Sequence, residues 1–122
     1  MAKKILLVDD DFNMLKLISS RLKAGGYEVI TASDSIQAVT KAHQEKPDLI
    51  ILDMRMPAGG GKTVYDNLKV STKTSLIPVI FITAYPSDEM RQKVMNMGAE
   101  DFITKPFKPE ELLSKVKKVL GE

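Results

Sequence analysis

Short apolar runs alternate with helical patterns along the whole of this 122-residue chain. The runs cover residues 5–8, 27–31, 49–52, 78–82 and 102–103, and several are continuously apolar, as in strands that are buried on both faces. Helical patterns, or signals for the start and end of a helix, cover residues 12–24, 34–45, 62–70, 86–98 and 109–119. Five strand–helix units of this kind predict a parallel sheet with helices on both faces.

The connections limit how five such units can be arranged. Right-handed crossovers leave few topologies, and the expected one is a flavodoxin-like, doubly wound α/β fold, (βα)5, with five parallel strands in the order 2-1-3-4-5. A chain of this length holds one hydrophobic core, so residues 1–122 are expected to form a single domain. Asp34, with Gln37 three residues later, resembles a capping box at the start of the second helix.

Composition excludes several classes of protein. The chain has no cysteine, which excludes disulfides, thiol catalysis and thiolate metal sites. Its apolar stretches are too short to span a bilayer, and the N-terminus lacks the apolar core of a signal peptide, so a cytoplasmic location is expected. A net charge of +2 with four Phe, three Tyr and no Trp gives little support to direct nucleic-acid binding.

Polar residues follow four of the five predicted strands. In an open α/β sheet, ligands bind outside the carboxyl ends of the strands, and strands 1, 3, 4 and 5 are neighbours in the predicted order. The sequence therefore predicts one crevice that contains carboxylates, a hydroxyl and an ammonium group. The residues at these strand ends are Asp9, Asp10, Asp11, Asp53, Thr83 and Lys105. Among them, Asp11 is better explained as the N-cap of the following helix than as a ligand.

The chemistry of such a crevice is restrictive. Carboxylates a few ångströms apart cannot all stay ionised at neutral pH without a counter-charge. A hard divalent cation such as Mg²⁺ supplies that charge, and Lys105 adds a second one. A cation, a lysine and a hydroxyl are also the groups that hold a phosphoryl group and neutralise its oxygens during transfer. Asp53, central among them, is therefore a candidate nucleophile that accepts a phosphoryl group.

The segment "DMRMPAGGGKT", residues 53–63, allows a different interpretation, because its end looks like a phosphate-binding P-loop. A Walker A motif requires glycine where Met56 stands. A Walker A motif also follows the first strand of a nucleotide-binding unit, whereas this segment follows the third predicted strand. The glycines are better explained as a flexible loop that ends at the start of a helix.

Four segments together resemble the receiver domain of bacterial two-component response regulators, in the stand-alone form of the chemotaxis regulators. They are "ILLVDDD", "PDLIILDMRMP", "PVIFITA" and "GAEDFITKPF", and their order and spacing are more specific than any one of them. The resemblance extends from about residue 4 to residue 120. It implies a signalling switch that is activated by phosphorylation.

The resemblance also implies roles for individual residues. Asp53 matches the aspartate that receives the phosphoryl group from a histidine kinase or a phosphotransfer protein. Asp10 matches the direct Mg²⁺ ligand, alongside Asp53 and the backbone carbonyl of Arg55, whereas Asp9 would act through water. Lys105 matches the lysine that pairs with the phosphoryl group. Such domains catalyse their own phosphorylation and a slow dephosphorylation.

The switch itself involves two further positions. Thr83 matches the hydroxyl residue that turns toward the phosphoryl group, and Phe102 matches the aromatic residue that swings inward with it. The bond between Lys105 and Pro106 is cis in similar proteins. The resemblance places the readout on the face of helix 4, strand 5 and helix 5, where a downstream protein of unknown identity would bind. Some receivers pair through this face when phosphorylated, and the sequence neither requires nor forbids such a homodimer.

The sequence departs from the family's pattern at two places. The run from Met56 to Gly61 is unusually rich in glycine, which leaves the mobility of this loop open. Arg55 and Tyr85 occupy positions that control how readily water reaches the phosphoaspartate, and a large Tyr85 would shield it.

Two alternatives to a stand-alone receiver remain at this point. A phosphohydrolase of the haloacid dehalogenase type also uses an aspartate nucleophile, but it requires Asp-x-Asp after strand one, where Asp9 and Asp10 are adjacent. The other alternative is a receiver that is part of a longer DNA-binding regulator.

Overall fold

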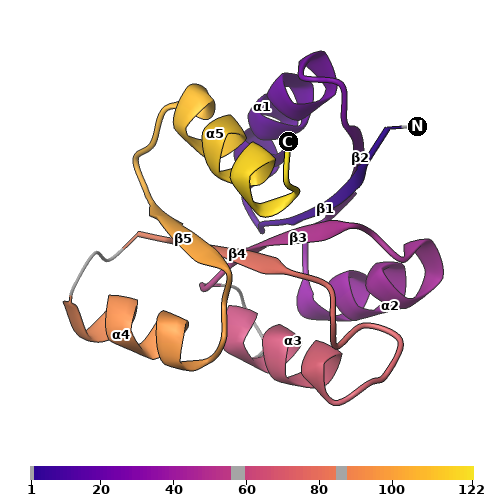
Figure 1. Ribbon diagram of the computed structural model, residues 1–122, viewed down its shortest axis with the longest axis vertical. Coiled ribbons are helices and arrows are strands. Elements are labelled where there is room, and N and C mark those ends of the chain that lie inside the picture. The colour runs from indigo at the N-terminus through magenta and orange to yellow at the C-terminus, as the bar shows by residue number, and fades with distance from the viewer. Residues whose placement is uncertain (1, 56–59, 85–87) are drawn as a thin grey trace.

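The computed structural model describes residues 2–55, 60–84 and 88–122, which form one sheet with helices on both sides (Figure 1). In chain order the elements are β1 (Lys4–Val8), α1 (Phe12–Ala24), β2 (Glu28–Ala32), α2 (Ser35–Glu45), β3 (Leu49–Asp53), α3 (Gly60–Lys69), β4 (Val79–Thr83), α4 (Asp88–Asn96), β5 (Asp101–Thr104) and α5 (Pro109–Val119). The predictions for the loop at residues 56–59 and for Tyr85 lie outside the described residues.

All five strands are parallel, and their order is β2-β1-β3-β4-β5, which confirms the predicted topology. The register is regular across the sheet: Val8 pairs with Leu52, Leu52 with Phe81, and Phe81 with Phe102. Because the strands stay in step, the carboxyl ends of β1, β3, β4 and β5 come together at one end of the sheet.

Alternate side chains of the strands form two hydrophobic cores. Ile5 and Leu7 of β1 belong to the core between the sheet and helices α1 and α5. Leu6 and Val8 belong to the core between the sheet and helices α2, α3 and α4 (Figure 1). Helices cover both faces, so β3 and β4 are buried along their whole length. Full burial of one such aliphatic side chain contributes about 1.5–3 kcal/mol. None of the described helices has the length and hydrophobicity needed to cross a lipid bilayer.

Helix starts follow the signals in the sequence, with one correction. Asp11 is the N-cap of α1, as predicted, and Asp34 is the N-cap of α2. The third helix was expected to start at about residue 62, after a flexible loop of glycines. Instead, α3 begins at Gly60, and both Gly60 and Gly61 are buried. The backbone of these two glycines packs directly against the end of β3, where a side chain would not fit.

Removing the N-cap of α2, by Asp34→Ala, is expected to lower the free energy of unfolding by about 1 kcal/mol. Asp34 accepts hydrogen bonds from the backbone N–H of Gln37 at 2.8 Å and from its side-chain amide at 3.0 Å. The Gln37 side-chain oxygen in turn accepts from the N–H of Ser33 at 3.3 Å. Urea denaturation measures the change, with Thr40→Ala, exposed on the same helix, as control. Equal losses in the two variants would exclude a capping role.

Candidate functional site

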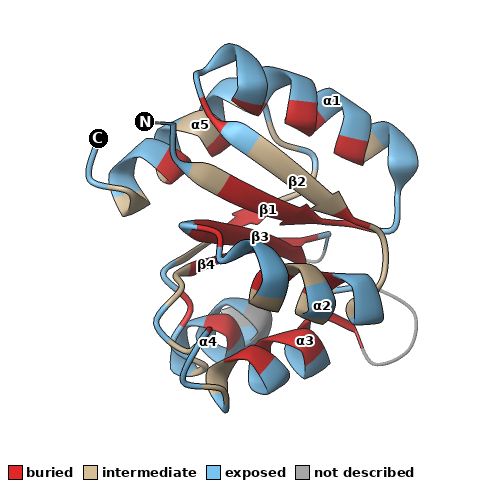
Figure 2. Cartoon of the chain, turned by 90° about the vertical axis from the view of Figure 1, so that its right-hand side faces the viewer, coloured by how far each residue is buried: buried red, intermediate tan, exposed pale blue. Residues whose placement is uncertain are grey.

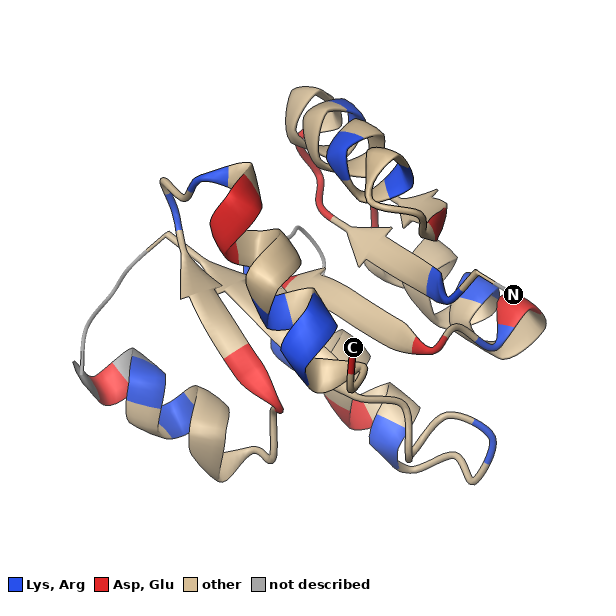
Figure 3. Cartoon of the chain, turned by 45° about the horizontal axis from the view of Figure 1, so that its top comes forward, with Lys and Arg blue, Asp and Glu red and all other residues tan. Residues whose placement is uncertain are grey.

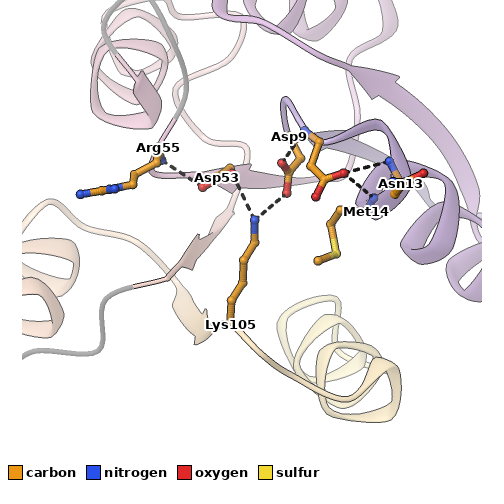
Figure 4. A network of polar contacts seen from close by, with 7 residues as sticks. Asp9, Asn13, Met14, Asp53, Arg55 and Lys105 are labelled. Atoms are coloured by element: carbon orange, nitrogen blue, oxygen red, sulfur yellow. Dashed lines mark hydrogen bonds and ion pairs between the residues drawn. The ribbon is translucent and has the colours of Figure 1, made fainter.

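Asp9, Asp53 and Lys105 meet at the carboxyl ends of the strands, although they are far apart in the sequence (Figure 4). Asp9 directly follows β1, Asp53 is the last residue of β3, and Lys105 directly follows β5. Since β4 separates β3 from β5, the long side chain of Lys105 extends across the end of β4 to reach the two carboxylates. The parallel order of the strands therefore brings together two carboxylates and the ammonium group that the sequence predicts at this end of the sheet.

The Lys105 ammonium lies between two buried carboxylates. Its Nζ is 3.1 Å from Oδ2 of Asp9 and 3.4 Å from Oδ2 of Asp53. Asp9 is 0% exposed and Asp53 is 4% exposed, whereas the Lys105 side chain keeps 23% of its surface in solvent. Carboxylates buried to this extent need a counter-charge, and one ammonium is shared between two of them.

The second oxygen of each carboxylate accepts a backbone N–H from two residues further along the chain. Oδ1 of Asp9 accepts from Asp11 at 3.0 Å, and Oδ1 of Asp53 accepts from Arg55 at 2.9 Å (Figure 4). These local contacts hold both side chains in place at the start of the loops that follow β1 and β3. Asp9 thus has both oxygens engaged by donors of the protein.

Asp10 completes a cluster of three carboxylates. One oxygen from each of Asp9, Asp10 and Asp53 lies within 4.8 Å of the others. Asp10 is exposed, and among the described residues its carboxylate has no hydrogen bond or ion pair. Three carboxylates around one ammonium leave an excess of negative charge, and oxygen ligands are those that Mg²⁺ prefers. The residues present therefore fit a hard divalent cation, with Asp10 on the open side.

The electrostatics of the cluster favour a proton or a cation at Asp53. Burial first of all, and the charge of Asp9 in addition, raise the pKa of Asp53 to about 6, against the opposing effects of the Arg55 N–H and the Lys105 charge. Burial by itself lowers the pKa of Lys105, but the charges of Asp53 and Asp9 outweigh it and leave that pKa above its ordinary value. Lys105 is therefore charged at neutral pH, while Asp53 ionises at a cost.

Of the two predicted switch residues, Thr83 lies at the same end of the sheet as this cluster, and Phe102 lies further back on β5. Thr83, the last residue of β4, is buried, and its carbonyl accepts the N–H of Lys105 at 2.7 Å. The peptide bond between Lys105 and Pro106 is cis. Phe102 on β5 is half-buried, and the guanidinium of Arg91 on α4 lies 5.6 Å from the centre of its ring. The sequence pattern contained no signal for the contact of Arg91, because it depends on how α4 packs against β5.

The described glycines of the P-loop-like segment do not form a free phosphate cradle. The N–H of Gly61 donates to the carbonyl of Met54 at 3.1 Å, so it is already used within the protein.

His43, the only histidine, lies on α2 rather than at the strand ends. The chemistry of the site therefore depends on carboxylates and Lys105.

Comparison with known proteins identifies the class. The family of the response regulator receiver domain matches residues 5–117, and the chain belongs to this family. It is 43% identical over 122 residues to the alkaline phosphatase synthesis transcriptional regulatory protein PhoP of Bacillus subtilis, an alignment that covers 98% of this chain and 49% of that protein. The chain thus spans about half the length of the curated relatives that it matches.

Two solved structures illustrate the likeness in three dimensions. The chemotaxis response regulator CheY4 of Vibrio cholerae has a TM-score of 0.91 and 33% identity, with coverage of 98% of this chain and 99% of that one. The receiver domain of a sensor histidine kinase of Pseudomonas aeruginosa has a TM-score of 0.90 and 30% identity over 100% of both chains. In that structure a magnesium ion is coordinated in the active site cleft.

Membership in this family has direct consequences. Receiver domains are signalling domains of two-component systems rather than classical enzymes, which argues against the phosphohydrolase alternative. They bind Mg²⁺ at an acidic site and interact with histidine kinases or phosphotransfer proteins. The cluster of Asp9, Asp10 and Asp53 provides an acidic site of this kind.

Proposed function

We propose that this chain is a phosphorylation-activated switch that accepts a phosphoryl group on Asp53. The observation that supports this most directly is the sharing of Lys105 by two buried carboxylates, with the exposed Asp10 beside them. Asp53 lies at the end of a central strand, where the N–H of Arg55 holds Oδ1 and the Lys105 ammonium faces Oδ2 at 3.4 Å. A phosphohistidine of a kinase or phosphotransfer protein is the donor.

In the transfer, an oxygen of Asp53 forms a bond to phosphorus while the bond from phosphorus to the donor nitrogen breaks. Magnesium, when bound by Asp10, Asp53 and the backbone carbonyl of Arg55, would neutralise the phosphoryl oxygens. Asp9, whose two oxygens accept from the N–H of Asp11 and from Lys105, would reach the metal through water. The Lys105 ammonium is close enough to exchange the Asp53 carboxylate for a phosphoryl oxygen.

The switch follows from contacts that exist only after phosphorylation. Thr83 and Lys105 would bind the new phosphoryl oxygens, and Phe102 would move inward as Thr83 turns. The contact between Arg91 and the ring of Phe102 would then change, which would alter the face formed by α4, β5 and α5. A downstream protein, or a second copy of the chain, would read that face.

Incubation with acetyl phosphate and Mg²⁺ is expected to add one phosphoryl group to the wild-type chain and none to Asp53→Asn. The intact mass measures the product, and beryllofluoride binding provides a second readout that does not depend on the lifetime of the phosphate. Asp66→Asn is a matched control, because Asp66 is an exposed residue on α3 that pairs with Lys62. A phosphoryl gain that persists in Asp53→Asn, or that needs no divalent cation, would refute the proposal.

What the switch controls is a separate proposal. The Bacillus subtilis relative is named as a transcriptional regulatory protein and is about twice as long as the matched region. This supports a role in the control of transcription, within a longer regulator, as one output of the switch. The length of the intact reading frame tests it.

A further inference from the structure

β2 forms the free edge of the sheet and lies between α1 and α2 (Figure 2). Side chains of these three elements and of the residues beside them line a groove at this edge. Its volume is about 530 Å³, within the range of clefts that bind ligands. The residues that line it include Phe12, Lys16, Lys23, Thr31, Ser33 and Lys41. This α1–β2–α2 groove contains none of the aspartates of the site described above, so it is a separate feature of the molecule.

The charge of the groove has one sign. Three lysines and no carboxylate line it: Lys16 and Lys23, about two helical turns apart on α1, and Lys41 on α2. Within the described part of the chain, none of the three forms an ion pair, whereas four other lysines do. In Figure 3, blue segments accordingly recur along α1. Like charges gathered without counter-charges create a positive potential that attracts an anionic partner.

Side chains of α2 hydrogen-bond to the backbone at Thr31 of β2 and at Ser33 just after it, and they hold the charge of Lys41 at this edge. The Nζ of Lys41 donates to the carbonyl of Thr31, and the side-chain oxygen of Gln37 accepts from the N–H of Ser33. Charged side chains at such an edge prevent the addition of another strand. The groove would therefore recognise a partner through its lysines and hydroxyls rather than by extending the sheet.

The dimensions favour an extended segment over a compact anion. From Phe12 to Lys23 the wall formed by α1 is about 16 Å long, the length of about five residues of extended chain. The hydroxyls of Thr31 and Ser33 offer further donors to carboxylates, and Phe12, 73% exposed, offers an apolar contact at one end. A nucleic acid fits less well, because the groove has a single aromatic residue and no arginine.

We propose that the α1–β2–α2 groove binds an extended acidic segment of a partner protein, about five residues long and with an apolar residue at one end. A segment bound in this groove would not contact Asp53, so its direct contacts would not depend on whether Asp53 is phosphorylated. The groove would give the switch a second partner surface, on the side of the sheet opposite to β5.

The test uses the whole chain and a fluorescein-labelled peptide of one leucine followed by five glutamates, with fluorescence anisotropy as the readout. We expect binding at low salt, little binding of the peptide in which glutamines replace the glutamates, and a loss of affinity of about tenfold or more in the double variant Lys16→Glu, Lys23→Glu. Phe12→Ala should weaken binding less, and Asp53→Asn should leave it unchanged. Amide resonances of Thr31 and Ser33 should shift on addition of the peptide.

The matched control is the double variant Lys117→Glu, Lys118→Glu, which changes the net charge equally at two exposed positions of α5. It should retain affinity within about threefold, since only screened, long-range attraction is lost. Equal losses in the two double variants, or no binding by the wild-type chain, would overturn the proposal. Stronger binding of a single-stranded oligonucleotide, abolished by the same α1 changes, would assign the groove to nucleic acid and overturn it as well.

Discussion

At pH 7 and without magnesium, the Asp53→Asn variant is expected to be more stable than the wild-type chain by about 2–3 kcal/mol. Burial first of all, and the charge of Asp9 in addition, raise the pKa of Asp53 from 3.8 to about 6. Folding at pH 7 therefore places an unfavourable carboxylate in the cluster, and asparagine removes that cost. Lys105 keeps its contact with Asp9 at 3.1 Å, so the variant leaves no buried ammonium without a partner.

The difference in the free energy of unfolding between Asp53→Asn and the wild type should grow as the pH rises. Below the unfolded pKa of 3.8, the carboxyl group is protonated in both states, and the two chains should be similarly stable. As the pH rises to about 6, the unfolded wild type loses its proton first, so its free energy of unfolding falls relative to that of the variant. Above about 6 the full difference should remain.

Urea denaturation in EDTA near pH 4 and at pH 7 measures this dependence. Asp66→Asn, at an exposed ion pair, should change the free energy of unfolding by less than about 0.5 kcal/mol at either pH. A variant at Asp53 that is less stable than the wild type at pH 7, or a gain that is the same at both pH values, would contradict the prediction. Such a stability cost at the proposed phosphoacceptor would be consistent with a site built to bind cations and phosphoryl groups rather than to stabilise the fold.

The strand order was predictable because local patterns locate the strands and right-handed crossovers leave few ways to connect them. Continuous apolar runs such as the one from Leu49 to Leu52 occur in strands covered on both faces, and the observed burial of β3 agrees. Once the order is known, the carboxyl ends of β1, β3, β4 and β5 must converge. Asp9, Asp53 and Lys105 could therefore be brought together from the sequence, without knowledge of any distance.

The sharing of Lys105 could not be predicted in the same way. The resemblance pairs Lys105 with the phosphoryl group, whereas in the structure its ammonium contacts both Asp9 and Asp53. Which carboxylate a long side chain reaches depends on its path across β4, and no pattern in the sequence encodes that path. The contact of Arg91 with Phe102 is likewise set by the packing of α4 on β5.

The predicted start of α3 was wrong for a different physical reason. Glycine has the lowest helix propensity apart from proline, so Gly60 and Gly61 indicate a loop when only local preference is considered. The structure uses them for the opposite purpose, as the buried first residues of a helix. Tertiary packing against the backbone of β3 outweighs the unfavourable propensity here, since only glycine allows such a close approach.

Gly61→Ala should therefore lower the free energy of unfolding by about 3 kcal/mol. A Cβ at this position would collide with the carbonyl oxygen of Asp53 and would lie 2.9 Å from Cα of Met54. These are backbone atoms of the last residue of β3 and of the residue after it, which cannot rotate away as the end of a side chain could. The collision opposes the gain of up to about 1 kcal/mol that alanine normally gives over glycine in a helix, so the sign of the change distinguishes the two effects.

Gly26→Ala is the matched control, because Gly26 has a φ of +96° but no atom within 4 Å of the added Cβ. Its cost should be only that of an unfavourable backbone conformation, about 1 kcal/mol. Urea denaturation compares the two, and acetyl phosphate labelling should fall in Gly61→Ala alone, since the collision displaces the backbone of the phosphoacceptor. If Gly61→Ala were as stable as the wild type or more so, the helix would have shifted away from β3 without cost. The glycine at residue 61 would then have no structural role in positioning Asp53.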